Sequence, residues 1–376
     1  MQFSDSETQK LLRDTTRSYL ADTYPYERLY ALKQERGQLP SESQKGFAEL
    51  GWLGMLAPEA AGGGGLSLLE AAVVIEEFGY AAVPAPVLVN NIAADLMSNG
   101  DAEEGVQDHL ARLCAGDRLY TVSEASRRRD RPSHGGDAAS PALSASGGNV
   151  SGVVPLVPFA ESAEFVLAPL SIEGEPAFAA VPLAQARLES VEMIDRATYR
   201  NVHIENADLD DLLILARGDE AEELHERCDA LCTAFSLIEL GGMMQRTLEM
   251  TTQYISNRVQ FGRPIGTFQA ARHRAAEMLR RTETTRWSAY HALWRFQEDP
   301  NDTEEIWLTK HWAIRAAELI YQNSHLLHGG VGVGAEYPLH LFTQQIAGFA
   351  VRTGAMNEMV ARTVESLQLP IFVPND

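Results

Sequence analysis

Residues 258–269 hold the side chains best suited to binding a charged ligand. They include two arginines, two glutamines and a Phe-Gly pair followed closely by a proline. The guanidinium of Arg258 is always charged, and its planar array of donors matches the geometry of a phosphate group. Long helical patterns flank the stretch on both sides, so we predict a phosphate-binding turn between two helices.

The overall charge sharpens this prediction. The chain carries 52 acidic and 31 basic side chains, a net charge of −21. Such an acidic chain repels nucleic acids and anionic membranes, which excludes them as general partners. A phosphate-rich ligand can bind only where local arginines reverse the field, and Arg258, Arg263 and Arg272 are therefore informative.

Length and composition indicate an ordinary globular enzyme. With 376 residues, 45% hydrophobic and 22% charged, the chain is too long for one simple core, so we expect two or three substructures. The first residues lack the features of a secretory signal, and no apolar run approaches the roughly 18 residues needed to span a bilayer.

The three cysteines favour a reducing, cytoplasmic setting. Cys228 and Cys232 are one helical turn apart, a spacing that would allow a two-thiol metal site. No histidine or second cysteine pair accompanies them, so we expect buried, inert thiols and no metal.

Residues 1–116 are predicted to form an all-helical domain. Helical patterns cover residues 3–20, with Ser4 or Asp5 as the N-cap, a segment after Tyr24-Pro25, and then residues 41–50, 66–80, 87–99 and 101–114. The four glycines at 62–65 could suggest a phosphate loop. No Lys-Ser/Thr follows them and no βαβ unit surrounds them, which favours a flexible turn.

The pattern changes to short β-type runs in residues 117–217. These runs cover residues 150–157, 164–170, 177–182, 187–193 and 199–204, and turn residues separate them at intervals typical of a small β-barrel or sandwich. An arginine-rich segment at 127–136 is expected to be a solvated loop, with an anion contact at the edge of a site as the alternative.

Residues 218–376 return to helical periodicity. Long helices are predicted up to about residue 256 and over residues 270–297, 303–327 and 339–367, which together make an antiparallel four-helix bundle. The predicted fold class is therefore α+β and multidomain: a helical domain, a small β-barrel or sandwich domain, and a helical bundle.

This order of domains, together with two motifs, resembles the acyl-CoA dehydrogenase family along the whole chain. One motif is the stretch 258–269, and the other is 328–332 followed by 336–338. Residues 51–59 and the helix at 68–79 are also similar to the family's N-terminal domain. The resemblance implies an FAD cofactor that lies between the β domain of one subunit and the C-terminal bundle of its neighbour.

The resemblance also implies roles for individual residues. Arg258 would contact the FAD pyrophosphate, with Gln260 and Phe261 lining that contact, and Gln269 would reach the adenosine part. Glycines leave room for backbone amides to approach a cofactor, which suits the turn at Gly329 and Gly330.

The positions that correspond to the family's catalytic base do not hold a carboxylate. In one branch of the family the base position falls on Thr353, and in another it falls on Cys232 of the first bundle helix. A threonine hydroxyl is far too weak a base, and a thiol in an apolar helix is normally protonated. The nearest carboxylates are Glu239, two helical turns from Cys232, and Glu358.

The β domain also departs from the family pattern. The flavin-facing loop would correspond to residues 122–130, which lack its usual proline and glycine. Residues 155–158 replace the Trp-Ile-Thr/Ser strand that backs the flavin, and Leu326 stands where many members have glutamine. The β-domain half of the flavin site is thus expected to be eroded, and the half around Arg258 to be intact.

An intact half-site without a base resembles one subunit of the heteromeric α₂β₂ acyl-CoA dehydrogenases of bacterial steroid side-chain degradation. The leading hypothesis is that this chain lacks the base and completes the FAD site of a homologous catalytic subunit, which binds the acyl-CoA. Three alternatives remain open: a self-sufficient homotetramer with a displaced base, a flavin oxidase or monooxygenase of the same fold, and a binder without flavin. The acyl group is not specified by any residue.

Overall fold

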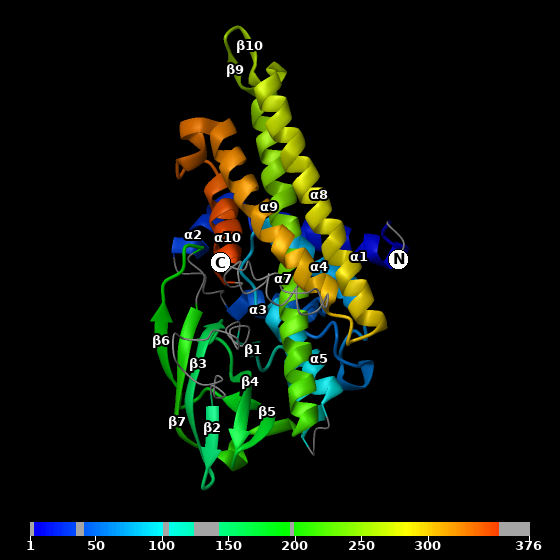
Figure 1. Ribbon diagram of the computed structural model, residues 1–376, viewed down its shortest axis with the longest axis vertical. Helices are drawn as coiled ribbons and strands as arrows, with labels where there is room; N and C mark the ends of the chain where they lie inside the picture. Colours follow the sequence, from blue (N-terminus) through cyan, green and yellow to red (C-terminus); the bar gives the residue numbers. More distant parts are fainter. Residues whose placement is uncertain (1–3, 35–40, 101–104, 124–142, 196–198, 353–376) are drawn as a thin grey trace, which may run out of the picture.

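A computed structural model describes residues 4–34, 41–100, 105–123, 143–195 and 199–352 (Figure 1). The N-terminal part consists of helices joined by short turns. They are α1 (Glu7–Thr23), α2 (Tyr26–Gln34), α3 (Ser41–Glu49), α4 (Leu68–Ala81), α5 (Val87–Asn99) and α6 (Val106–Ala115), with a short 3-10 turn, η1 (Glu59–Ala61).

The structure corrects the predicted start of the first helix. Its N-cap is Ser6, not Ser4 or Asp5: the Ser6 hydroxyl accepts from the Gln9 amide at 3.2 Å, and the Gln9 side chain accepts from the Ser6 amide at 2.9 Å. These two reciprocal hydrogen bonds make a capping box, for which Ser4 with Glu7 offered the same sequence pattern two residues earlier in the chain.

The glycine run is a turn, as predicted. The amides of Gly63, Gly64 and Gly65 donate to the carbonyls of Pro58, Gly54 and Ala57 at 3.1, 2.9 and 2.9 Å. Because their donors are already engaged by the chain itself, these glycines cannot cradle a phosphate.

The central β domain is one connected sheet with strand order β6-β7-β3-β2-β4-β5-β8, and β1 pairs in parallel with β4. Three short strands, β1, β2 and β8, were missed by the sequence patterns because they hold only three to five residues. The arginine-rich segment at 127–136 lies outside the described residues. The strands are β1 (Tyr120–Val122), β2 (Leu143–Ser146), β3 (Asn149–Pro158), β4 (Phe165–Ile172), β5 (Glu175–Pro182), β6 (Arg187–Val191), β7 (Tyr199–Asp208), which the 3-10 turn η3 (Leu209–Asp211) follows, and β8 (Leu213–Arg217).

The C-terminal part is built on α7 (Asp219–Asn257), whose 39 residues extend for about 58 Å from the sheet to the opposite tip of the molecule (Figure 1). A small hairpin, β9 (Val259–Gln260) and β10 (Arg263–Pro264), and the turn η4 (Ile265–Thr267) form that tip. The chain then returns through α8 (Gln269–Glu298), α9 (Glu304–His328), η5 (Gly329–Val333) and α10 (Leu339–Arg352). The order helical, β, helical confirms the predicted fold class.

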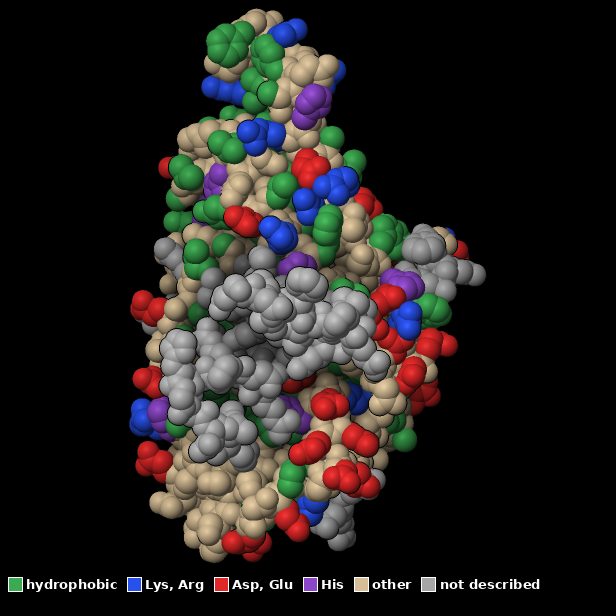
Figure 2. Space-filling model, viewed as in Figure 1, with side chains coloured by type: hydrophobic (Ala, Val, Ile, Leu, Met, Phe, Trp, Pro, Cys, Tyr) green, Lys and Arg blue, Asp and Glu red, His purple; other side chains and the backbone are tan. Residues whose placement is uncertain are grey.

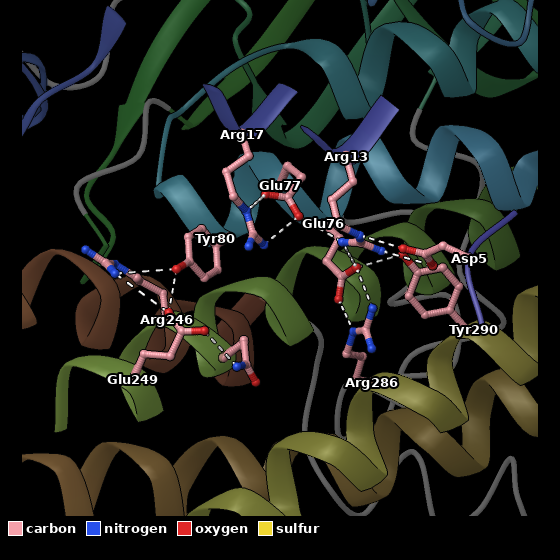
Figure 3. A network of polar contacts seen from close by, with 11 residues as sticks. Asp5, Arg13, Arg17, Glu76, Glu77, Tyr80, Arg246, Glu249, Arg286 and Tyr290 are labelled. Atoms are coloured by element: carbon pink, nitrogen blue, oxygen red, sulfur yellow. Dashed lines mark hydrogen bonds and ion pairs between the residues drawn. The ribbon is translucent and has the colours of Figure 1, made fainter. Parts of the chain in front are cut away.

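Close backbone contact and a buried ion network join the first and last domains. A Cβ atom added to Gly79 of α4 or Gly242 of α7 would lie 2.1 Å from a carbonyl oxygen of the other helix. Beside this crossing, Glu76 accepts from the guanidinium of Arg13 at 2.7 Å, from the Tyr290 hydroxyl at 2.8 Å and from Arg286 (Figure 3).

The same network extends to the next residue of α4. Glu77 accepts from Arg13 at 2.8 Å and from Arg17 at 2.7 and 2.8 Å, and Asp5 accepts from Arg13 at 2.8 Å. Helices α1, α4 and α8 are therefore linked by three arginines and three carboxylates (Figure 3).

Candidate functional site

The tip of the bundle is a tight two-residue hairpin. Gln260 pairs with Arg263, and the turn residues Phe261 and Gly262 both have left-handed backbones, with φ of +52° and +79°. This conformation is unusual for a bulky residue and costs on the order of 1–3 kcal/mol. The Phe261 side chain is nonetheless 92% exposed, and its edge-on contact with the Phe268 ring, 6.1 Å between centroids, offsets little of the strain.

The arginines of the tip have no carboxylate partner in the part of the chain that the structure describes. The exposed side chain of Arg258 makes no hydrogen bond or ion pair to any residue that the structure describes, and Arg263 instead lies over the ring of Phe268, 4.2 Å from its centroid. Arg272 donates to the carbonyl of Gly266 at 3.0 Å. The tip therefore presents guanidinium groups to the outside.

Charge is distributed unevenly along the molecule. Residues 242–281 contain seven arginines and two glutamates, a local net charge of +5 in a chain of −21. By contrast, the first turn of α7 contains Asp219, Glu220 and Glu222. On the face shown in Figure 2, arginines and hydrophobic side chains gather at the tip, and acidic side chains dominate the lower part. The excess of arginines over acidic residues therefore lies in the half of α7 and α8 that carries the tip.

The two glutamines of the motif are also at the tip. Gln260 is exposed, and its side-chain amide donates to the carbonyl of Val259 at 2.8 Å. Gln269 is the exposed first residue of α8. Sequence-predicted residues Arg258, Gln260, Phe261 and Gln269 are therefore brought together on one projection.

The glycine turn lies at the end of the neighbouring helix. Gly329 ends α9 with φ of +60°, and a Cβ atom added to Gly329 or Gly330 would meet no atom within 4 Å. The next two valines, Val331 and Val333, are exposed. This second segment is separate from the hairpin in Figure 1, and the two are linked by stacked rings of Tyr254 and His328, 4.5 Å apart.

The exposed guanidinium of Arg258, the left-handed turn and the open space beside the glycines fit a pyrophosphate-bearing cofactor such as FAD. All of them face outward, so they can make one side of a cofactor site and not an enclosed pocket. A cofactor bound there would need further contacts beyond the described tip.

The structure also locates one of the two base positions. Cys232 is 0% exposed in the middle of α7, surrounded by the hydrophobic core, whereas Thr353 and Glu358 lie outside the described residues. Glu239 is half-buried where α4 crosses α7, and seven residues place it about 10 Å along the helix from Cys232.

The buried carboxylates of the described chain are mostly neutralised. They are Glu76, Glu77, Asp95, Asp195 and Asp229. The first two belong to the ion network, and Asp95 accepts from Arg227 at 2.6 and 2.8 Å. Burial opposes ionisation of Glu76, but Arg286 and Arg13 outweigh it and lower its pKa. A carboxylate held in this way is a poor proton acceptor.

Asp229 was passed over in the sequence analysis. It precedes Cys232 by three residues on α7, and one of its oxygens lies 3.9 Å from Nε2 of buried His225. Only helical spacing relative to Cys232 could have singled it out in the sequence, and several carboxylates share that property.

The strand predicted to replace the flavin-backing strand is irregular. The pairing of β3 with β7 shifts register between Val154 and Val157, and Leu156 has a left-handed backbone with φ of +51°. Pro155 and Pro158 have no amide hydrogen to donate, which accounts for a bulge here. Most of the loop at 122–130 lies outside the described residues.

The structure shows no disulfide or metal site in the described ranges. Cys114, Cys228 and Cys232 are buried and not disulfide-bonded, and no group of three or more potential metal ligands occurs within these ranges. Among the helices described, none is both long and apolar enough to cross a membrane.

Comparisons with known proteins cover both ends of the chain. Residues 6–117 match the family description "Acyl-CoA dehydrogenase, N-terminal domain", and residues 234–367 match "Acyl-CoA dehydrogenase, C-terminal domain". The chain is 26% identical over 291 residues to acyl-CoA dehydrogenase FadE28 of Mycobacterium tuberculosis, covering 77% of this chain and 81% of that protein. It is 27% identical to acyl-CoA dehydrogenase IpdE2 of Mycolicibacterium smegmatis, covering 95% and 98%.

Solved structures show the same fold. A chain of the ChsE4–ChsE5 complex from Mycobacterium tuberculosis superposes with a TM-score of 0.87 at 22% identity, covering 99% of this chain and 100% of that one. A variant of the Tcur3481–Tcur3483 steroid ACAD gives 0.85 at 24% identity, covering 96% and 98%.

Proposed function

This chain belongs to the acyl-CoA dehydrogenase family, whose cofactor is FAD, and we propose that it is the subunit that completes the FAD site of a homologous catalytic partner. The observation that carries the proposal is the hairpin tip, where Arg258 has no partner among the described residues and strained Phe261 is exposed. Both features are explained if the tip is completed by a second subunit and its cofactor.

The residues of this chain bind and orient the cofactor in this proposal. Arg258 holds the pyrophosphate, Gln260 and Phe261 line that contact, and Gln269 reaches the adenosine. The backbone amides at Gly329 and Gly330 approach the cofactor. When bound, FAD accepts the β hydride of an acyl thioester while a carboxylate takes the α proton. Cys232 cannot take that proton, so we assign the base to the partner.

Relatives support a heteromeric assembly and a steroid side-chain substrate. The matched structures include the ChsE4–ChsE5 complex and a steroid ACAD, each composed of two differently named chains. We therefore propose an α₂β₂ heterotetramer, a cytoplasmic location, and domains at 1–116, 117–217 and 218–376. The domain limits fall between α6 and β1 and between β8 and α7.

Purification of the chain alone and of its complex tests the proposal. We expect the chain alone to contain little FAD and to be inactive, and the complex with a co-purifying homologous subunit to absorb near 450 nm and desaturate an acyl-CoA. Full FAD content and full activity of the pure chain would overturn the assignment.

A second candidate is a self-sufficient dehydrogenase with a displaced base. Buried Asp229 near Cys232 favours it, and half-buried Glu239 is a further candidate on the same helix. If the pure chain is active, the variants Asp229→Asn and Glu239→Gln distinguish these two residues. Replacement of the residue that acts as the base should lower the rate about 10²–10⁴-fold. An oxidase or monooxygenase would instead consume oxygen in the presence of substrate.

A further inference from the structure

Two segments that we assign to the cofactor are 70 residues apart in sequence, and a small aromatic cluster joins them. We propose that Tyr254, His328 and Tyr337, the three-ring cluster, act as positioning residues that fix the Arg258 hairpin relative to the Gly329–Gly330 turn. This inference rests on the proposed function and concerns the geometry of the same site.

The three rings pack directly against one another. Tyr254 stacks on His328 with 4.5 Å between ring centroids and 27° between planes. His328 and Tyr337 are 5.0 Å apart, and Tyr254 meets Tyr337 edge-on at 6.1 Å. Each ring comes from a different element: the last turn of α7, the last residue of α9 and the loop before α10.

Hydrogen bonds orient the central ring. Nδ1 of His328 lies 2.8 Å from the carbonyl of Ser324, and because a carbonyl can only accept, Nδ1 carries the proton. Nε2 is then the acceptor for the Tyr337 hydroxyl at 3.2 Å. His328 is 3% exposed, and burial lowers its pKa, which keeps the ring in this neutral form.

The three-ring cluster connects directly to both segments, the Arg258 hairpin and the Gly329–Gly330 turn. The backbone amide of Arg258 donates to the carbonyl of Tyr254 at 2.8 Å, so the last turn of α7 sets where the hairpin begins. His328 directly precedes Gly329, and a Cβ atom added to Gly332 would lie 2.9 Å from Cβ of His328. The glycine turn therefore wraps tightly around this histidine.

The hairpin needs such a support. Val259 and Phe261 are exposed, so they provide little packing to hold the tip in place. A ligand clamp made of two separately mobile segments must be ordered on binding, which weakens affinity. Because the rings hold the two segments together before the cofactor binds, less ordering is needed on binding.

Amide hydrogen exchange of the full-length chain tests the coupling without any cofactor. In Tyr254→Leu we expect exchange to become about tenfold faster both at residues 258–266 and at residues 329–334, with α5 unchanged as an internal control. Tyr254→Phe keeps the ring and should restore slow exchange. Faster exchange in one segment only, or in neither, would overturn the proposal.

A gentler pair of variants covers the case in which Tyr254→Leu fails to fold. Tyr337→Phe removes only the hydroxyl that His328 accepts from, and we expect about threefold faster exchange in both segments. Tyr321→Phe on α9 removes an exposed hydroxyl and is the matched control, with no change expected. Equal behaviour of the two variants would contradict a role for the hydrogen bond.

The complex provides the second measurement. We expect the FAD dissociation constant of the complex carrying Tyr254→Leu to rise about tenfold, with Tyr254→Phe close to wild type. If the wild-type complex binds no FAD, the proposed function fails, while the exchange data still decide whether the rings couple the two segments. If exchange responds but FAD affinity does not, the rings do not position the cofactor.

Discussion

Arginines serve opposite purposes in two regions of this molecule. In the ion network between α1, α4 and α8, Arg13, Arg17 and Arg286 are bound to buried Glu76 and Glu77 (Figure 3). At the hairpin tip, Arg258 and Arg263 have no carboxylate partner among the described residues, although the chain as a whole has a large excess of acids. The first group is satisfied internally and joins domains, and the second remains available for a ligand.

The difference has an energetic basis. Buried charges must be paired, because an isolated ion in a low-dielectric interior is strongly unfavourable. An exposed guanidinium stays hydrated at little cost and can exchange water for phosphate when a ligand arrives. A variant in the network should therefore affect folding, and a variant at the tip should affect binding.

The largest effect is expected for Arg286→Met in the ion network. Glu76 would keep Arg13 and the Tyr290 hydroxyl but lose its charged partner from α8, and breaking a buried pair typically costs about 3–5 kcal/mol. Chemical denaturation of the full chain measures this loss of stability. Arg280→Met on the same helix removes an exposed pair with Glu277 and a contact with the Trp312 ring, 5.7 Å from its centroid, and should move the denaturation midpoint little. An equal loss of stability in Arg286→Met and Arg280→Met would contradict the view that the buried ion network stabilises the fold more than the exposed pair does.

Arg258→Met should produce the opposite result. A hydrogen bond to a charged group contributes about 1.5–3 kcal/mol, so the FAD dissociation constant of the complex should rise roughly 10- to 150-fold. The denaturation midpoint of the isolated chain should not move, since the side chain has no partner within the described part of the protein. Arg258→Lys keeps the charge without the planar guanidinium, so its FAD dissociation constant should lie between those of the wild type and Arg258→Met.

The ion network also predicts how stability depends on pH. Burial raises the pKa of Glu76, but Arg286 and Arg13 dominate and leave it lowered in the folded chain. The unfolded chain therefore takes up this proton first as the pH falls. The stabilisation is present above a pH of about 4.3, the ordinary glutamate value, and is lost as the pH falls through the folded pKa. Glu76→Gln should flatten this acid limb, and an unchanged limb would contradict the assignment.

The smallest effect is expected for Phe261→Asn at the turn. Asparagine tolerates a left-handed backbone better than phenylalanine, so stability of the isolated chain should rise by up to about 1 kcal/mol. Assembly with the partner or FAD content should nevertheless decrease, because the exposed ring is lost. A variant that is more stable and equally well flavinated would show that the ring has no binding role.

Local patterns predicted much of the fold. The 3.6-residue periodicity of residues 87–99 predicted α5 with the observed ends, because proline before it and glycine after it mark both termini. The short strands β1, β2 and β8 escaped prediction, since three to five residues carry too little alternation and their partners are distant in sequence. The N-cap of α1 was placed wrongly because three candidate polar residues, Ser4, Asp5 and Ser6, precede it.

For the candidate site, too, the sequence predicted some features and only the structure revealed others. The sequence by itself determined that a turn with an arginine, a Phe-Gly pair and flanking glutamines separates two long helices, because these residues are adjacent along the chain. It also determined that no carboxylate stands at Cys232 or Thr353. Only the tertiary structure decided that Glu76 is neutralised by Arg13 and Arg286, and that Tyr254, His328 and Tyr337 meet. These contacts join residues far apart in the chain, and their energies depend on burial and distance, which no local pattern encodes.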